Sequence, residues 1–127
     1  MKHKSSSSGQ TVVALLIFMM LAITLTLTAA MVVIINTQSD ITYQQGEQAL
    51  ENAQSGVENA LLRLERDSAY TGETLPLADG TATITVSGTD PVTIVSVGYA
   101  GHLVRTITVT AGVSGSIITV TNWSETP

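Results

Sequence analysis

The side chains that could carry out catalysis or hold a metal are few in this sequence, and they lie far apart along it. His3 and His102 are isolated from each other, and the chain contains no cysteine. Neither a glycine-rich phosphate loop, nor a metal-ligand spacing, nor a nucleophile motif occurs among its 127 residues. We therefore expect that the protein is not an enzyme and that it requires no metal and no cofactor.

Charge and cysteine content exclude further classes of protein. The formal net charge is -5, and the positive side chains are too few and too dispersed to form a phosphate-binding patch. They are Lys2, Lys4, Arg63, Arg66 and Arg105. We therefore predict no nucleic-acid partner, and the lack of cysteine excludes a disulfide framework and a thiolate zinc site.

The longest uniform feature is an apolar run from Thr11 to Ile35, which contains no charged residue. As a helix, its 25 residues would reach about 38 Å, enough to cross a hydrocarbon core of about 30 Å. The alternating stretch ITLTLT is strand-like, but lipid favours the helix, in which each threonine hydroxyl can bond back along the chain. The run exceeds the roughly 7–15 apolar residues of an export signal. Small residues at Thr28, Ala29 and Ala30 nevertheless leave a secreted protein without residues 1–30 as an alternative.

The charges that flank this run predict its orientation. Lys2 and Lys4 precede it, and the first charge after it is Asp40. The positive-inside rule then places the N-terminus in the cytoplasm and the chain beyond about residue 36 outside. We therefore expect a single-pass protein of the cytoplasmic (inner) membrane.

The segment after the apolar run has the period of an amphipathic helix. Large side chains recur every seven residues and small ones stand three residues further on, which defines a packing seam. The seam comprises Tyr43, Leu50, Ala53, Val57, Ala60 and Leu64. Nothing between Ile35 and Asp40 compels a break, so one helix is expected from about Gln10 to about Asp67. The seam could pack on the chain's own domain or on another subunit, and both remain open.

Beyond residue 73 the period changes to two. Four β-branched runs, TATITVS, VTIVSVGY, HLVRTITVT and SIITVTNW, are separated by turn signals and predict an antiparallel meander. A four-stranded sheet leaves one apolar face that needs a cover, and the seam helix can provide it. The expected fold is therefore α+β, with a long N-terminal helix packed on a small four-stranded antiparallel sheet.

The order of these features resembles a type IV pilin or pseudopilin. A short basic leader ends at Gly9, the apolar run follows at once, and the helix continues as QALENAQSGVENALLRL before a small sheet. The resemblance divides the chain into a leader peptide (1–9), a transmembrane and filament-core helix (10–36), an amphipathic extension (37–72) and a sheet region (73–127).

The resemblance also implies processing and assembly. A prepilin peptidase would cut after Gly9, and the new N-terminal residue, Gln10, would be N-methylated. The apolar helix would lie first in the membrane and later in the core of a cell-surface filament. Its partners would be other pilin subunits and the pilus assembly machinery. The core-forming side chains would include Val12, Val13, Leu15, Leu16, Phe18 and Leu21.

Two positions depart from the family pattern. The family usually has Phe where this chain has Gln10, and Glu at the fifth mature position, where this chain has Ala14. The second departure favours a minor or atypical subunit over a major one. The alternative function is an unprocessed single-pass membrane protein with a small extracytoplasmic binding or adhesion domain, which would be indifferent to replacement of Gly9.

Overall fold

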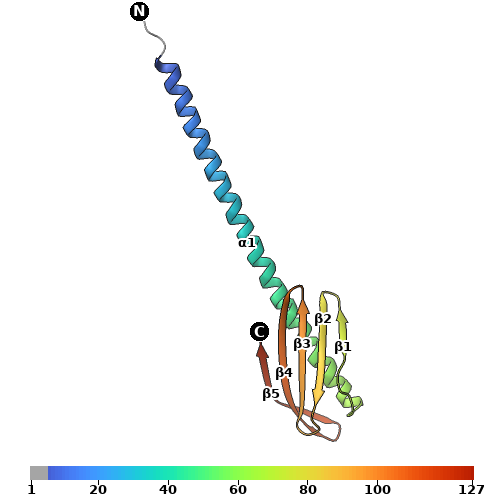
Figure 1. Cartoon of the computed structure of the whole chain (residues 1–127). Coiled ribbons are helices and arrows are strands. Elements are labelled where there is room, and N and C mark those ends of the chain that lie inside the picture. Colours follow the sequence, from blue (N-terminus) through green and yellow to red (C-terminus); the bar gives the residue numbers. More distant parts are fainter. Residues whose placement is uncertain (1–5) are drawn as a thin grey trace, which may run out of the picture. The chain divides into compact units, whose positions relative to one another are not determined.

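The computed structural model describes residues 6–127, and the predicted leader residues Lys2, His3 and Lys4 lie outside the described residues. The described residues form one helix and five strands, so the fold is α+β as predicted (Figure 1). They are α1 (Ser6–Arg66), β1 (Thr74–Leu77), β2 (Gly80–Ser87), β3 (Val92–Ala100), β4 (Leu103–Ser114) and β5 (Ile117–Thr126). The chain divides into two compact units, Met1–Asp40 and Ile41–Pro127.

The helix α1 is unbroken, and it ends one residue before the predicted boundary at Asp67. No proline interrupts its sequence, and the threonines of its apolar part satisfy their hydroxyl groups within the helix. The hydroxyls donate to carbonyls three or four residues earlier: Thr24 to Leu21 (2.9 Å), Thr26 to Ala22 (2.7 Å), Thr28 to Thr24 (2.8 Å) and Thr37 to Val33 (2.9 Å). The strand-like alternation of ITLTLT therefore does not determine the local structure.

The sheet has five strands in the part of the chain that the structure describes, so the prediction of four was wrong by one. The additional strand, β1, pairs antiparallel with β2, from Thr74 opposite Thr83 to Leu77 opposite Gly80. It has only four residues and includes Pro76, which lacks a backbone donor. An edge position tolerates such a residue because one side of an edge strand forms no ladder.

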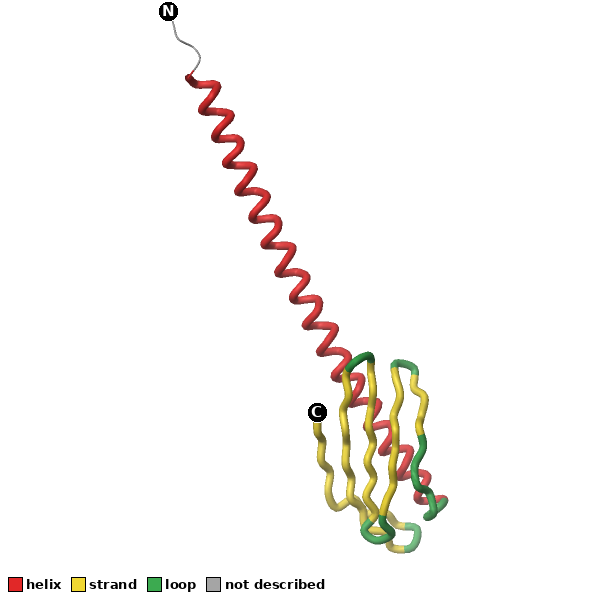
Figure 2. The backbone as a smooth tube through the Cα atoms, in the orientation of Figure 1, coloured by secondary structure: helices red, strands yellow, loops and turns green. Residues whose placement is uncertain are grey.

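The strands follow one another as an antiparallel meander in the order β1-β2-β3-β4-β5, with short loops between them (Figure 2). The central strand β3 alternates between one buried face and one partly exposed face. The register between β4 and β5 shifts at Thr110 and Ala111, which pair with Asn122 and Val120. Thr121 is therefore an extra residue in β5, that is, a β-bulge.

The core of the unit Ile41–Pro127 lies between the C-terminal part of α1 and one face of the sheet. The helix contributes two alanines, a valine and a leucine, and the strands contribute only β-branched residues. The buried cluster is formed by Ala53, Val57, Ala60 and Leu64 from α1 and by Ile84, Val92, Ile94, Ile107 and Val109 from the sheet.

Candidate membrane-spanning and packing surfaces

The apolar part of α1 has no cover. Among the described residues, α1 is the one helix long and apolar enough to cross a membrane, with a mean hydropathy of 2.6 in its most apolar window and none of that window buried. A continuous apolar surface of this length is not stable in water, so it requires lipid or other protein around it. The predicted core-forming side chains all belong to this surface and are between 56 % and 71 % exposed: Val12, Val13, Leu15, Leu16, Phe18 and Leu21.

The predicted processing site lies on the first turns of this helix. Gly9 and Gln10 are both helical and exposed. A Cβ atom placed on Gly9 would meet no atom within 4 Å. The fold therefore gives no packing reason for glycine at this position, and glycine is also a poor residue for a helix.

The seam of α1 faces the sheet along most of its length. Ala53, Val57 and Ala60 are fully buried, Leu64 is 7 % exposed, and the partly buried Leu50 packs against the same cluster. The predicted seam member Tyr43 differs, since it is 69 % exposed and is not part of the cluster.

The environment of Tyr43 is that of a surface residue. Glu47, one turn along the helix, accepts a hydrogen bond from its hydroxyl and raises the pKa of Tyr43 above its ordinary value. Tyr43 is therefore paired with a polar neighbour on α1, and the seven-residue repeat extends beyond the part of the helix that the core covers.

Glycine allows the closest approach between helix and sheet. A Cβ atom on Gly98 of β3 would collide with the carbonyl oxygen of Ala49 and the backbone nitrogen of Ala53. A Cβ atom on Gly56 of α1 would collide with the Ser96 hydroxyl oxygen and lie 3.1 Å from the Cβ atom of Ala82. Backbone therefore meets backbone at this interface, and any larger side chain would separate the two layers.

Two buried polar side chains at this interface were not predicted from the sequence. The Asn52 Nδ2 atom donates a hydrogen bond to the Tyr99 carbonyl, at 2.9 Å, and so ties α1 to the end of β3. Ser96 is fully buried, and its hydroxyl has no hydrogen-bond partner among the described residues. An i, i+7 helical pattern contains no signal for either residue, because each contact depends on how the helix is seated on the strands.

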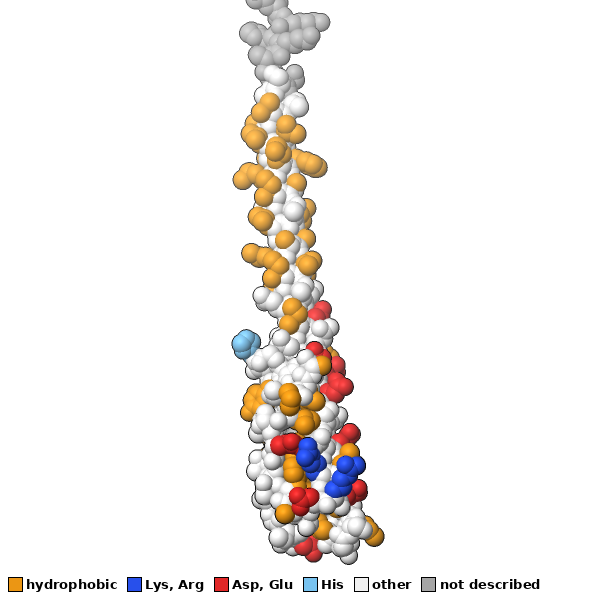
Figure 3. Space-filling model, turned by 90° about the vertical axis from the view of Figure 1, so that its right-hand side faces the viewer, with side chains coloured by type: hydrophobic (Ala, Val, Ile, Leu, Met, Phe, Trp, Pro, Cys, Tyr) orange, Lys and Arg blue, Asp and Glu red, His pale blue; other side chains and the backbone are white. Residues whose placement is uncertain are grey.

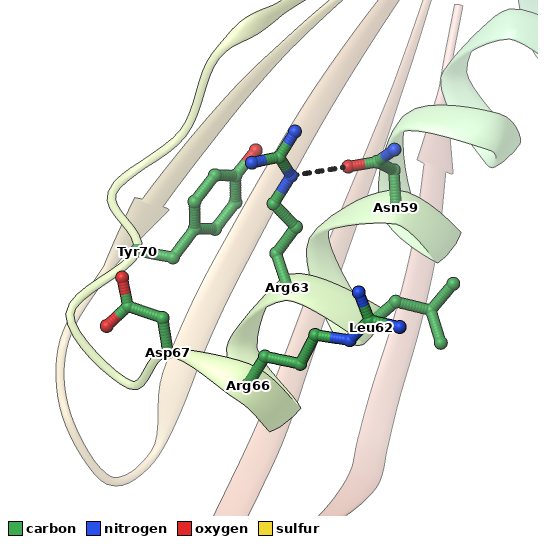
Figure 4. Close-up of a pocket in the computed structure, with 6 residues that line it drawn as sticks. All are labelled: Asn59, Leu62, Arg63, Arg66, Asp67 and Tyr70. Carbon is green, nitrogen blue, oxygen red and sulfur yellow. Dashed lines mark hydrogen bonds between the residues drawn. The ribbon is translucent and has the colours of Figure 1, made fainter.

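A pocket lies at the C-terminal end of α1 (Figure 4). It is lined by Asn59, Leu62, Arg63, Arg66, Asp67 and Tyr70. Arg63 forms an ion pair with Glu73, with 2.9 Å between Nε and Oε1, and its guanidinium carbon lies 5.7 Å from the centre of the Tyr70 ring. The Tyr70 hydroxyl also donates to Glu73, at 3.1 Å.

These contacts give the pocket a structural role. Burial, and secondarily the bond to Glu73, raise the pKa of Tyr70 to about 12, so the phenol is neutral at ordinary pH. The charge of Arg63 is balanced by Glu73, and the pair holds the segment after the helix against its last turns. Nowhere in residues 6–127 do three or more His, Cys, Asp or Glu side chains form a group able to hold a metal ion.

A long helix, apolar in its N-terminal part and packed in its C-terminal part on a small antiparallel sheet, is a pilin-like architecture. Comparison of the chain with models of protein families, with curated proteins and with solved structures found no match.

Proposed function

We propose that this protein is a structural subunit of a type IV pilus-like or type II secretion pseudopilus-like filament. The observation that carries the proposal is the apolar, wholly exposed N-terminal part of α1, which continues without a break into the helix that covers the sheet. Such a segment is stable in lipid, and it is equally stable among the helices of neighbouring subunits. One surface therefore serves both as membrane anchor and as filament core.

The proposed maturation begins on the cytoplasmic side of the inner membrane. Prepilin peptidase cuts after Gly9, Gln10 becomes the N-terminal residue and is N-methylated, and the sheet domain lies outside. Cleavage before the apolar run is necessary for this function, because the anchor must survive processing to form the filament core. The assembly machinery then moves the subunit into a cell-surface filament with other subunits.

The geometry of Gly9 supports this maturation. Glycine at this helical position is not needed for packing, since a Cβ atom there would be in open space. A requirement for glycine would therefore come from the enzyme that binds and cuts the leader. Ala14, in the place of the usual glutamate, favours a minor or atypical position in the filament.

Intact mass and N-terminal sequence of the protein from membranes and from sheared surface material test the proposal. We expect a chain that begins at Gln10, with or without one added methyl group. Gly9→Val should leave the leader attached, whereas the neighbouring Ser8→Val, which is equally exposed, should be processed normally.

Other N-termini would refute the proposal. A wild-type chain that still begins at Met1 would instead support an unprocessed single-pass membrane protein with an extracytoplasmic binding domain. A chain that lacks residues 1–30 would show that the run is a secretory signal.

A further inference from the structure

One tripeptide of the sequence has no part in the proposed function. Asn122-Trp123-Ser124 is an asparagine followed, after one residue that is not proline, by a serine. This spacing is the acceptor motif for N-linked glycosylation. None of the other three asparagines of the chain has serine or threonine two positions later, so the motif occurs once.

The motif lies in the middle of β5 and directs two of its side chains away from α1. Trp123 lies opposite Val109, which is fully buried toward the helix, whereas Asn122 lies opposite Thr110. Because successive residues of a strand point to opposite faces, the side chains of Asn122 and Ser124 share the outer face of the sheet. All three residues of the motif are exposed, and the side-chain amide of Asn122 forms no hydrogen bond within residues 6–127.

β5 is also the strand that can open with least damage to the core. It pairs with β4 on one side only, because it stands at the end of the strand order (Figure 1). The bulge at Thr121 interrupts this pairing immediately before Asn122, and every residue of β5 except Ile118 is exposed. A segment with few partners and little buried surface opens locally at low cost, so a modifying enzyme can reach the motif while the core stays folded.

The two edges of the sheet differ in how they are protected. At the opposite edge, β1 is four residues long and contains Pro76, which removes one donor. β5 is ten residues long and contains neither proline nor lysine, and its one charged residue is Glu125. Edge strands normally avoid pairing through shortness, proline or lysine, so β5 lacks these protections. A bulky, hydrated group on the side of β5 would supply the protection that its sequence lacks.

The surroundings of Asn122 suit a neutral sugar. Buried residues alternate with more exposed ones along β3 and β4, so the residues of the outer face can be assigned. In β3, β4 and β5 this face carries no charged side chain, and beside Asn122 it presents the threonines of β4, Thr106, Thr108 and Thr110. An oligosaccharide can therefore lie against hydroxyl and methyl groups without covering an unpaired charge.

We propose that Asn122 carries an N-linked oligosaccharide. The proposal rests on one element of the proposed function, the location of the sheet domain outside the cytoplasm, because this motif is used in exported chains. The donor is an oligosaccharide joined through a diphosphate to a membrane lipid. The Nδ2 atom of Asn122 attacks C1 of the first sugar, the bond from C1 to the diphosphate oxygen breaks, and the lipid diphosphate leaves. The amide gives one proton to a base of the transferase and keeps the other, and nothing is oxidised or reduced.

Intact mass and fragmentation spectra of the mature protein, purified from the membranes of its native host, test the proposal. We expect a mass above that of the unmodified chain by a whole number of sugar residues, and fragments that place this mass on Asn122. Asn122→Gln and Ser124→Ala should each remove it completely, because one lacks the acceptor and the other the hydroxyl of the motif. Ser124→Thr, which keeps the hydroxyl, and Asn36→Gln, which lies outside the motif, are the matched controls and should keep it.

Several results would overturn the proposal. They are a wild-type chain without sugar, sugar on a different residue, sugar retained in Asn122→Gln, or sugar lost in either control. The assignment on the wild-type chain stands even if a variant is unstable. The same spectra report the N-terminus, so this proposal and the proposed function fail separately. A chain that begins at Gln10 without sugar contradicts only the glycan, and a glycosylated chain that still begins at Met1 contradicts only prepilin processing.

Discussion

The N-terminal part of α1, residues 8–40, and its C-terminal part, residues 41–66, share one backbone but have different surroundings. Every residue of the first part is exposed, although it is the more apolar of the two. Figure 3 shows the exposed apolar side chains of this first part. The second part buries small residues such as Ala49, Ala53 and Ala60 against the sheet. The apolar character of a segment therefore does not by itself determine whether the rest of the chain buries it.

The difference lies in the kind of partner that each part can accept. Lipid chains are fluid and fit around large, uneven side chains such as Phe18, Met20 and Leu25. A sheet is rigid, and a helix can approach it closely only where its own side chains are small or absent. In the proposed function the first part meets a deformable environment and the second a fixed one, so substitutions that change side-chain size should affect the two parts differently.

The largest effect is expected for Gly98→Ala, because the added Cβ atom would collide with the backbone of α1 at Ala49 and Ala53. Backbone cannot move aside as a side chain can, so we expect the free energy of unfolding to fall by about 3 kcal/mol. Urea unfolding in detergent, followed by Trp123 fluorescence, measures it. Gly112→Ala in β4, where the added Cβ atom would lie no closer than 4.0 Å to its neighbours, is the matched control. Equal stability of the two variants would show that the close approach is not essential.

Ala60→Leu should be the next most damaging change. Ala60 is fully buried beneath the sheet, so the larger side chain would overpack the core at a cost of about 2 kcal/mol. The same substitution in the uncovered part of the helix, Ala29→Leu, should leave the urea unfolding midpoint equal to that of the wild type within experimental error. If both variants lost stability equally, the contrast between the two parts of α1 would be wrong.

Gly56→Ala should destabilise the fold by about 1–2 kcal/mol, since its Cβ atom would meet the Ser96 hydroxyl. Ser96→Ala removes a buried hydroxyl that has no partner among the described residues, so alone it should be neutral or slightly stabilising. The double variant should recover part of the loss, and a double-mutant cycle measures this coupling. If the changes in unfolding free energy of the two single variants simply added, the Ser96 hydroxyl would not be the group that collides with the new Cβ atom.

The smallest effect concerns pH. The pKa of Tyr70 is raised to about 12 in the folded chain from an ordinary value of 10.0, so the fold favours the neutral phenol. The resulting stabilisation is complete below pH 10.0 and is lost as the pH rises toward about 12. Tyr70→Phe should weaken this alkaline loss, which urea midpoints between these pH values will show. An unchanged pH profile would mean that burial at the end of α1 has little effect on the phenol.

The helix and the four longer strands of this protein could be predicted, because each of them has a clear period. The long apolar run and the seven-residue seam indicated one continuous helix, and the alternating runs indicated β2 to β5. β1 was missed because four residues with a proline carry little strand signal. Tyr43 was included in the seam because a repeat in the sequence contains no information about where its cover ends.

The contacts between the layers could not be predicted in the same way. Ser96, Gly98 and Asn52 acquire their roles from the seating of α1 on β3, which joins residues more than 40 positions apart, as in the bond from Asn52 to Tyr99. The bulge at Thr121 likewise depends on pairing with β4 and interrupts the alternation that the sequence suggests. Such features depend on how distant elements align in the fold, and a local sequence pattern contains no information about that alignment.

The threonines of the apolar part of α1 have a consequence for transfer between environments. The hydroxyls of Thr24, Thr26, Thr28 and Thr37 each donate to a carbonyl of their own helix, so they need no hydrogen-bond acceptor from their surroundings. Moving the segment from one dry medium to another would break no hydrogen bond and create no need for a new one. In this setting a threonine behaves like a valine, because its hydroxyl is already hydrogen-bonded within its own helix.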